Sequence, residues 1–399
     1  MNARRVAYEA VRRTFEQGAY TDRAFAALAE GLEPRERRRA MRLAFGAVQR
    51  MRTVDHAIQA LAGRRPQRLQ AELRNALRVA GYELLFAHGT PPHAAVSQGV
   101  ELARTVAGAR TSGLANAVLR RIAEAGPGWV ATLPLPLRES YPDWVIEEWV
   151  AMLGEQQASE LARAQNEPPE LSLRVNTLRI SPAELDLGVP WHGDSELPEA
   201  AVLDQPLDVA SSDAFRSGLV WPQSRASMLP ARLLAPQPEM RVLDLCAAPG
   251  GKSGQLAALM DDRGELVCVD RHPGRASELS ATLERLGVTC ARIELGDALD
   301  FAERGFDRIL LDPPCSGLGV LASRPDARWR RTPEGAAQVA ELQRRLLDHA
   351  RSLLAPGGRL VYSVCTIRRA EGEQVLAGGR QTLLHRDGTD GFYIAATDA

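Results

Sequence analysis

The chain has 399 residues, 45% hydrophobic and 25% charged, which is enough for two or three globular domains. No apolar run approaches the roughly 18 residues of a membrane span and no signal-peptide core is present, so we expect a cytoplasmic protein with no membrane partner. Its five cysteines include no C-x-x-C pair, which argues against a disulfide framework and against a structural zinc site, so no metal is expected.

The net charge of −1 hides an uneven distribution of charge. Residues 1–125 carry 21 arginines and 11 acidic residues, whereas residues 126–235 carry 7 arginines and 16 acidic residues. A basic N-terminal module predicts a polyanionic partner, with nucleic acid as the first candidate. An arginine-rich surface that only faces solvent would give the same composition.

Residues 4–125 show apolar side chains at helical spacing almost throughout, without strand-like alternation. Glycine and proline breaks divide this segment into a predicted all-α bundle of six or seven helices. The runs GYELLFAHGTPPHAAVSQGVELAR and GLANAVLRR resemble the NusB-type RNA-binding helical domain. The resemblance implies that residues 1–125 form a domain that binds RNA.

Residues 126–235 are richer in proline, tryptophan and acidic residues, and they predict a small α+β connecting domain. Helical spacing covers 141–165, and the alternating run at 171–180 predicts a strand. The acidity of this domain argues against phosphate binding, except at single arginines such as Arg174.

Residues 236–399 alternate between short apolar runs and helical patterns, which predicts an α/β Rossmann-like domain. The expected strands are 241–246, 265–270, 290–295, 307–312 and 359–364, the expected helices are 253–261, 273–286 and 334–354, and the expected closing hairpin is 381–384 with 391–395.

The run MRVLDLCAAPGGK, Met240 to Lys252, reads as a buried strand, a glycine turn and the start of a helix. A Walker A loop would need glycine where Cys246 stands, and the dinucleotide pattern G-x-G-x-x-G is absent. A site for S-adenosylmethionine (SAM) is the remaining interpretation. Lys252 is the only lysine of the chain, which suggests that a compact ammonium is needed there.

Aspartates at the ends of the next strands support the SAM interpretation. Asp270 can accept hydrogen bonds from ribose hydroxyls, and Asp297 follows the third strand, where adenine would lie. Asp312 closes the fourth strand and begins the run DPPCSG. Each of them alone would more often be a helix cap or a turn residue. Together they follow one edge of the predicted sheet.

Two thiols are expected beside this site, because Cys315 lies in DPPC and Cys365 ends the fifth strand. Carbon 5 of a pyrimidine becomes nucleophilic when a thiolate adds to carbon 6, and the resulting enamine can accept a methyl group. Asp312 would bind the N3/N4 edge of a cytosine and disperse charge in the adduct. The positive charges of SAM and of Lys252 could lower the pKa of the attacking thiol.

The runs DLCAAPGGKS, DPPCSGLG, PDARW, VYSVCT and DGFYIA resemble the Nop/Sun family of RNA 5-methylcytosine methyltransferases. This resemblance implies SAM-dependent methylation of cytosine C5 in RNA, with 16S rRNA as the expected substrate and partner. It implies that Cys365 is the nucleophile, that Cys315 assists product release and that Asp312 binds the base. The expected SAM contacts are Cys246, Ala247, Ala248, Pro249, Gly250, Gly251, Lys252, Asp270, Arg275, Asp297 and Asp312.

The chain departs from this family beside the nucleophile, because Val364 replaces the family's threonine and removes a neighbouring hydroxyl. Three other readings stay open. A DNA cytosine-C5 methyltransferase would use Cys315 as nucleophile, a NusB-like assembly factor would carry a vestigial methyltransferase domain, and the substrate could be tRNA or another RNA. The arginines 324, 330 and 331 around PDARW are candidates for contacts with RNA phosphates, although such side chains more often face solvent. We expect a monomer.

Overall fold

The computed structural model describes residues 2–87 and 89–399. The chain forms two compact units. The helical unit runs up to Glu167 and includes Leu321–Arg330. The sheet unit comprises Pro168–Val320 and Arg331–Ala399. No helix of the described residues is long and apolar enough to cross a membrane.

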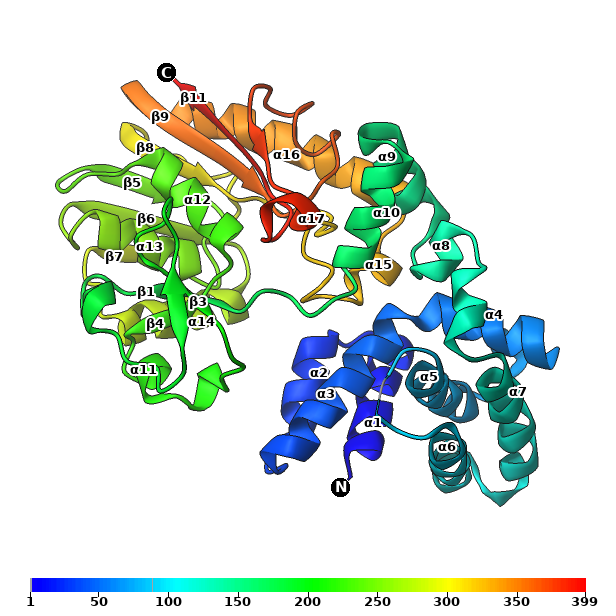
Figure 1. Cartoon of the computed structure of the whole chain (residues 1–399). Coiled ribbons are helices and arrows are strands. Elements are labelled where there is room, and N and C mark those ends of the chain that lie inside the picture. Colours follow the sequence, from blue (N-terminus) through cyan, green and yellow to red (C-terminus); the bar gives the residue numbers. More distant parts are fainter. Residues whose placement is uncertain (1, 88) are drawn as a thin grey trace. The chain divides into compact units, whose positions relative to one another are not determined.

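The N-terminal part of the helical unit is the predicted bundle (Figure 1). Its α-helices are α1 (Ala3–Glu16), α2 (Thr21–Leu28), α3 (Pro34–Gln49), α4 (Met51–Ala62), α5 (Ala71–Leu85), α6 (Pro92–Ala107) and α7 (Ser112–Ala131). Their apolar faces meet in one core, which includes Leu43, Ile58 and Leu119. Gly126 adopts a left-handed φ of 61° and kinks α7 at the position where the composition changes. His88, within the NusB-like run, lies outside the described residues.

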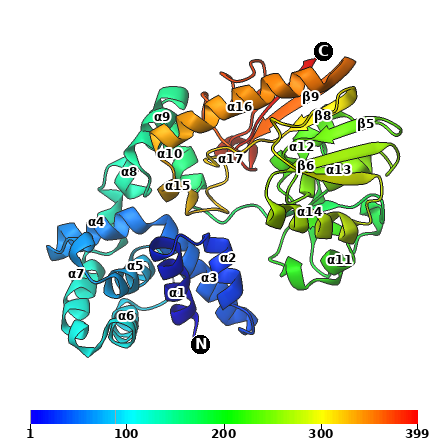
Figure 2. The same ribbon diagram turned by 180° about the vertical axis from the view of Figure 1, so that it is seen from behind.

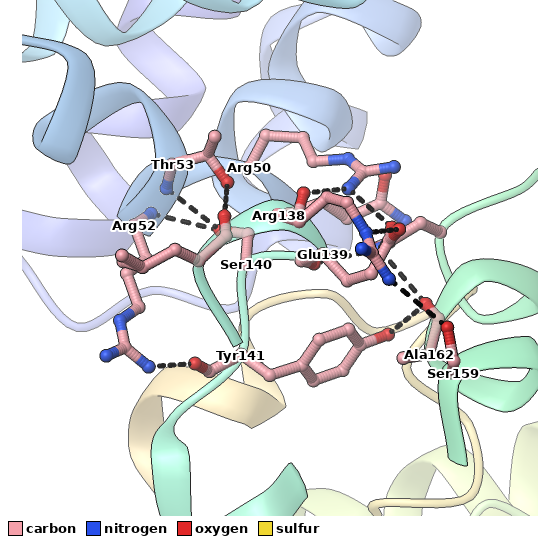
Figure 3. A network of polar contacts seen from close by, with 12 residues as sticks. Arg50, Arg52, Thr53, Arg138, Glu139, Ser140, Tyr141, Ser159 and Ala162 are labelled. Carbon is pink, nitrogen blue, oxygen red and sulfur yellow. Dashed lines mark hydrogen bonds and ion pairs between the residues drawn. The ribbon is translucent and has the colours of Figure 1, made fainter. Parts of the chain in front are cut away.

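A second group of helices belongs to the same unit: α8 (Leu135–Arg138), α9 (Asp143–Leu153) and α10 (Glu155–Ala164). Figure 3 shows the polar contacts that hold this group against α4. Arg50 forms an ion pair with Glu139 at 3.0 Å, and the hydroxyl of Ser140 accepts a hydrogen bond from the backbone N–H of Arg52 at 3.1 Å. The hydroxyl of Tyr141 donates to a carbonyl of α10. The predicted helical stretch 141–165 is thus two helices, separated at Gly154.

The segment Leu321–Arg330, which contains PDARW and the short helix α15 (Ala327–Arg330), packs into the helical unit. Arg328 is fully buried, with its guanidinium 4.1 Å from the ring centre of Tyr141 and 2.9 Å from the side-chain oxygen of Asn166. Trp329 donates to the carbonyl of Val48 at 2.7 Å. These side chains therefore anchor the segment within the unit.

The sheet unit begins with a small antiparallel sheet of order β2-β3-β1-β4. Its strands are β1 (Ser172–Val175), β2 (Trp191–Gly193), β3 (Ala200–Leu203) and β4 (Val220–Pro222), and α11 (Asp213–Arg216) and α12 (Arg225–Leu234) accompany them. The predicted strand 171–180 was too long. It ends before Asn176, whose side-chain amide turns to donate to the carbonyls of Gly218 and Leu286.

The large sheet has the order β10-β11-β9-β8-β5-β6-β7, in which β5 to β9 run parallel and β10 and β11 close the edge in antiparallel fashion. Its strands are β5 (Arg241–Asp244), β6 (Glu265–Asp270), β7 (Ala291–Leu295), β8 (Phe306–Leu311), β9 (Leu354–Val364), β10 (Arg380–Gln381) and β11 (Tyr393–Asp398). The predicted strands and closing hairpin are present, and the short helix α17 (Leu384–Asp387) lies within the hairpin.

Helices cover both faces of this sheet. One face packs against α12, α13 (Gly251–Leu259) and α14 (Pro273–Leu286), and the other packs against α16 (Pro333–Leu353), which lies alongside β9 in Figure 2. The predicted fold class, an all-α bundle with a small α+β domain and an α/β domain, is therefore confirmed.

Candidate active site at the carboxyl edge of the large sheet

The carboxyl ends of the parallel strands bring the predicted site residues to one edge of the large sheet. Asp270 is the last residue of β6, Asp297 lies two residues beyond β7, Asp312 directly follows β8, and Cys365 directly follows β9. Because neighbouring parallel strands end at the same edge, this is where an open α/β sheet binds its ligand.

The glycine turn lies between β5 and α13. Gly250 has a left-handed φ of 102°, and a Cβ atom there would lie 2.8 Å from the side chain of Leu279. A Cβ atom on Gly251 would lie 2.4 Å from the indole nitrogen of Trp221. Among the described residues no side chain caps the N-terminus of α13, so the first N–H groups of this helix are available to a ligand.

Two arginines hold the glycine turn by hydrogen bonds to its backbone carbonyls. Arg174 is buried and donates to the carbonyl of Gly251 at 3.3 Å and to the side chain of Gln223 at 3.0 Å. Its burial lowers its pKa to about 10. Arg174 was considered as a phosphate contact, and this was wrong, because its guanidinium is used inside the protein. Arg275 donates to the carbonyl of Ala248 at 2.5 Å and lies 3.5 Å from the carboxylate of Asp270.

The remaining predicted cofactor residues line the same region. The thiol of Cys246 packs against one of the cores, and burial, together with the charge of Asp244, raises its pKa, so Cys246 stays a neutral thiol. Asp270 accepts from the N–H of His272 and Asp297 from the N–H of Leu299, both at 3.0 Å. These aspartates thus also stabilise local turns.

The sulfur atoms of Cys315 and Cys365 are 3.1 Å apart, which is hydrogen-bond distance for two thiol groups. The N–H of Gly319 donates to the carbonyl of Cys365 at 3.0 Å and holds the loop that carries Cys315 beside the end of β9. The hydrogen bond with Cys365, burial, and the negative charges of Cys365, Glu371 and Asp312 raise the pKa of Cys315. Cys315 is therefore held in its protonated form.

Lys252 forms an ion pair with Asp312, with 2.7 Å between Nζ and Oδ2. The other carboxylate oxygen, Oδ1, accepts a hydrogen bond from the hydroxyl of Ser363 at 2.9 Å. Nζ also lies 5.3 Å from the ring centre of Phe392. Burial acts to lower the pKa of Lys252, but the charge and hydrogen bond of Asp312, together with the charges of Cys365 and Asp244, outweigh it, so the pKa is raised and the ammonium stays charged.

Sequence reasoning missed the residues that hold the Cys315 loop. Glu371 is fully buried, and its Oε2 accepts from the N–H of Ser316 at 2.7 Å and from the side-chain amide of Gln343 at 3.2 Å. Gln343 also donates to the carbonyl of Pro314 at 2.8 Å. Glu371 follows Cys365 by six residues, and the sequence alone assigned it no role.

A hydroxyl is present next to Cys365 despite the valine at position 364. Thr366 follows the cysteine, and its hydroxyl lies 2.8 Å from the hydroxyl of Ser316, on the loop of the other thiol. Arg331 donates to the carbonyls of Cys315 at 3.0 Å and Ser316 at 2.9 Å, so this arginine supports the same loop.

The other two candidate arginines, Arg324 and Arg330, precede Arg331 and are both exposed, but they differ in their contacts. Arg330 donates to the carbonyl of Gly18 at 2.9 Å within the helical unit, while Arg324 has no such side-chain contact among the described residues. Of the three predicted candidates for RNA phosphate, only Arg324 thus lacks such a structural use among the contacts described here.

Comparisons with known proteins agree with this organisation. The family model of the 16S rRNA methyltransferase RsmB/F matches residues 231–381, the NusB family model matches residues 1–124, and a model of the RsmF/B-like ferredoxin-like domain matches residues 141–210. In the structural comparison, the methyltransferase homolog protein from Pyrococcus horikoshii is 30% identical, with a TM-score of 0.60 over 66% of this chain and 97% of that one.

Relatives match over nearly the full length. A Synechocystis protein named "Probable ribosomal RNA small subunit methyltransferase B" is 35% identical over 390 residues, which cover 94% of this chain and 87% of the relative. The Vibrio cholerae protein named "Ribosomal RNA small subunit methyltransferase B" is 31% identical over 439 residues, covering 99% and 97%. The chain therefore belongs to the RsmB/F family of 16S rRNA methyltransferases.

Proposed function

We propose that the chain transfers a methyl group from SAM to C5 of a cytosine in 16S rRNA, through a covalent bond between Cys365 and C6 of the base. The observation that carries this proposal is the pair of thiols, 3.1 Å apart, beside the ion pair of Lys252 and Asp312. The names of the relatives supply small-subunit rRNA as the substrate class. We expect the protein to act in the cytoplasm, because its relatives are bacterial proteins named as methyltransferases of ribosomal RNA.

The donor set at the sheet edge fits SAM. The carboxylates of Asp270 and Asp297 suit ribose hydroxyls and the amino group of adenine, and the uncapped N-terminus of α13 suits a carboxylate. Lys252 and Cys246 to Gly251 would hold the cofactor from the side of β5. When bound, SAM supplies an electrophilic methyl group on its sulfonium sulfur.

The chain's own residues would activate and release the base. The thiolate of Cys365 forms a bond to C6, and the electron pair of the C5–C6 double bond moves to C5, which becomes nucleophilic. Asp312 hydrogen-bonds the N3/N4 edge and disperses the charge of the adduct. After methylation the C5 proton passes to a solvent base, the C5–C6 double bond forms again, and the sulfur of Cys365 leaves as a thiolate that accepts a hydrogen bond from Cys315.

The electrostatics favour Cys365 over Cys315 as the nucleophile. The environment of Cys315 raises its pKa and keeps it protonated, which suits a hydrogen-bond donor. Burial and Asp312 have the largest effects on the pKa of Lys252, in opposite directions. The charge of Cys365 has a smaller effect, and it raises this pKa, so the ammonium and this sulfur interact favourably. A neutral donor and a nearby cation are what a thiolate nucleophile needs.

The test compares wild type, Cys365→Ala and Cys315→Ala with tritiated SAM and unmethylated small-subunit rRNA. Cys365→Ala should lose transfer and form no adduct, whereas Cys315→Ala should accumulate a protein–RNA adduct that survives denaturation. Cys290→Ala, which removes a thiol just before β7 at the opposite edge of the sheet, serves as the control and should behave as wild type.

Each alternative predicts a different outcome of this test. If Cys315→Ala abolishes the adduct and Cys365→Ala retains it, the nucleophile is Cys315, as in DNA cytosine methyltransferases. If wild type neither binds SAM nor transfers methyl groups, the chain acts as a NusB-like assembly factor. If the enzyme methylates tRNA in preference to 16S rRNA, then tRNA is the substrate.

A further inference from the structure

The turn between α4 and α5 forms a concavity far along the sequence from the candidate active site. It has a volume of about 510 Å³ and is lined by Gly63, Arg64, Arg65, Arg68 and Leu69. All three arginines are exposed. The three guanidinium groups therefore give the concavity a strongly positive lining.

Among the described residues these arginines have no acidic partner, unlike several other arginines of the helical bundle. Arg4, Arg12, Arg39, Arg50, Arg52, Arg74, Arg78 and Arg104 each lie within 4 Å of a carboxylate. In the parts of the chain that the structure describes, the side chains of Arg64, Arg65 and Arg68 form no ion pair and no hydrogen bond. Their positive charge is thus available to a ligand.

The surrounding sequence contributes no negative charge. Residues 56–71 contain three arginines and no aspartate or glutamate. The next acid, Glu72, lies near α1, where its charge adds to the effect of burial in raising the pKa of Tyr8. Arg121 of α7 donates to the carbonyl of Leu61 at 3.4 Å, which brings a fourth exposed arginine to the same turn. Like charges that gather without counter-charges favour an anionic ligand.

The backbone of the turn is fixed before any ligand binds. Gly63 takes a left-handed φ of 64° and its N–H donates to the carbonyl of Gln59 at 3.0 Å. Pro66 is buried and begins a 3₁₀ turn, which the N–H of Arg68 closes onto the carbonyl of Arg65 at 3.0 Å. A preorganised backbone lowers the entropic cost of holding the guanidinium groups around an anion.

We propose that this concavity binds the phosphodiester backbone of the RNA substrate through Arg64, Arg65 and Arg68. The inference rests on the proposed function for the identity of the RNA. Guanidinium groups bind phosphate oxygens in pairs of parallel hydrogen bonds, and contacts to the backbone position an RNA without reading its sequence. The concavity therefore orients the RNA, and the residues at the sheet edge would select the base.

The test replaces all three arginines with glutamine, giving Arg64→Gln/Arg65→Gln/Arg68→Gln. The matched control removes three arginines at the surface, fully or partly exposed, that already have acidic partners, as Arg104→Gln/Arg344→Gln/Arg351→Gln. Binding of unmethylated small-subunit rRNA is measured by fluorescence anisotropy between 50 and 200 mM salt. SAM binding is measured separately by calorimetry.

We expect the slope of log affinity against log salt to become shallower by about 2 to 3 in the first variant, because each lost phosphate contact removes roughly 0.7 to 0.9 of slope. The control should keep the wild-type slope, and both should bind SAM normally. Lysine at all three positions should restore most of the slope. A wild-type slope in the glutamine variant would overturn the proposal.

Failure of the proposed function can be distinguished from failure of this proposal. If the proposed function is wrong, wild type does not transfer methyl groups, but the change in salt slope between wild type and the glutamine variant still tests whether the concavity binds RNA. A third arm adds inorganic phosphate. If millimolar phosphate competes with RNA in wild type and in the glutamine variant alike, the competition arises elsewhere and the concavity is not the site.

Discussion

Replacing Glu371 with glutamine tests whether this buried carboxylate positions the loop of Cys315. Its two oxygens accept from Ser316 at 2.7 Å, from Gln343 at 3.2 Å and from Arg368 at 3.3 Å, and the residue is fully buried. Glutamine keeps the shape and one acceptor oxygen. The substitution removes the negative charge, and it places an NH₂ group, which cannot accept a hydrogen bond, opposite one or more of these donors.

The cost follows from these three hydrogen bonds. A bond to a charged group contributes about 1.5–3 kcal/mol and a neutral bond about 0.5–1.5 kcal/mol, so losing the charge weakens each bond by roughly 1 kcal/mol. The bonds from Ser316 and Gln343 hold the loop, so the loop should be destabilised by about 2 kcal/mol locally. Because about 1.4 kcal/mol corresponds to a factor of ten, hydrogen exchange at the Ser316 amide should accelerate about 30-fold.

The chemistry of Cys315 should change in a defined direction. Glu371 is one of the charges that raise the pKa of Cys315, after the hydrogen bond with Cys365 and burial. Removing the charge should lower that pKa, so that iodoacetamide modifies Cys315 faster at a given pH, as mapped by mass spectrometry. Adducts with RNA should also last longer, because the leaving sulfur of Cys365 loses a well-positioned donor.

The control makes the same chemical change two residues away. Glu373 is exposed, and Glu373→Gln should leave both hydrogen exchange at Ser316 and alkylation of Cys315 at wild-type values. If Glu371→Gln matched this control in exchange, alkylation and adduct lifetime, the carboxylate would have no positioning role, and the reasoning would be refuted.

Two further predictions concern buried charges. Burial raises the pKa of Asp244 to about 7, against the hydrogen bond from Ser253, so the folded chain binds a proton that the unfolded chain releases above about pH 4. The free energy of unfolding of wild type should fall by up to roughly 4 kcal/mol as the pH rises from about 4 to 7, whereas that of Asp244→Asn should not. The urea midpoint of the sheet unit is measured at each pH, and the same pH dependence in both proteins would contradict this. Arg328→Ala should destabilise the helical unit by about 3–5 kcal/mol, because it leaves acceptors unpaired and a cavity against Tyr141. Faster hydrogen exchange in α4 and α9 would show it, and wild-type exchange would rule it out.

Local sequence patterns predicted well those elements whose ends are marked by residues such as proline at the start of a helix and glycine at its end. The predicted strand 265–270 and helix 273–286 agree with β6 and α14 residue for residue, because Pro273 begins the helix and Gly287 ends it. The strand predicted at 171–180 failed because Asn176 turns towards backbone carbonyls from two distant parts of the chain. Such partners leave no periodic trace in the sequence.

The same distinction separates the predicted site residues from the missed ones. Lys252, Asp312 and Cys365 lie at strand ends or in motifs, where position along the chain implies position in space. Glu371 acquires its role from Ser316, 55 residues away, and Arg174 from Gly251, 77 residues away. Nothing in an isolated glutamate or arginine shows whether it will be buried or exposed.

The single lysine gains a physical explanation from its geometry. Nζ of Lys252 donates to Oδ2 of Asp312 at 2.7 Å, while Oδ1 accepts from Ser363. An ammonium is a compact donor that leaves lone pairs on both carboxylate oxygens for the amino edge of a cytosine. A guanidinium would engage both oxygens in a parallel pair of hydrogen bonds and compete with Ser363 and with the base. Arginine serves at every other basic position of this chain. At this one it would neutralise the aspartate and also occupy the acceptors that base recognition requires.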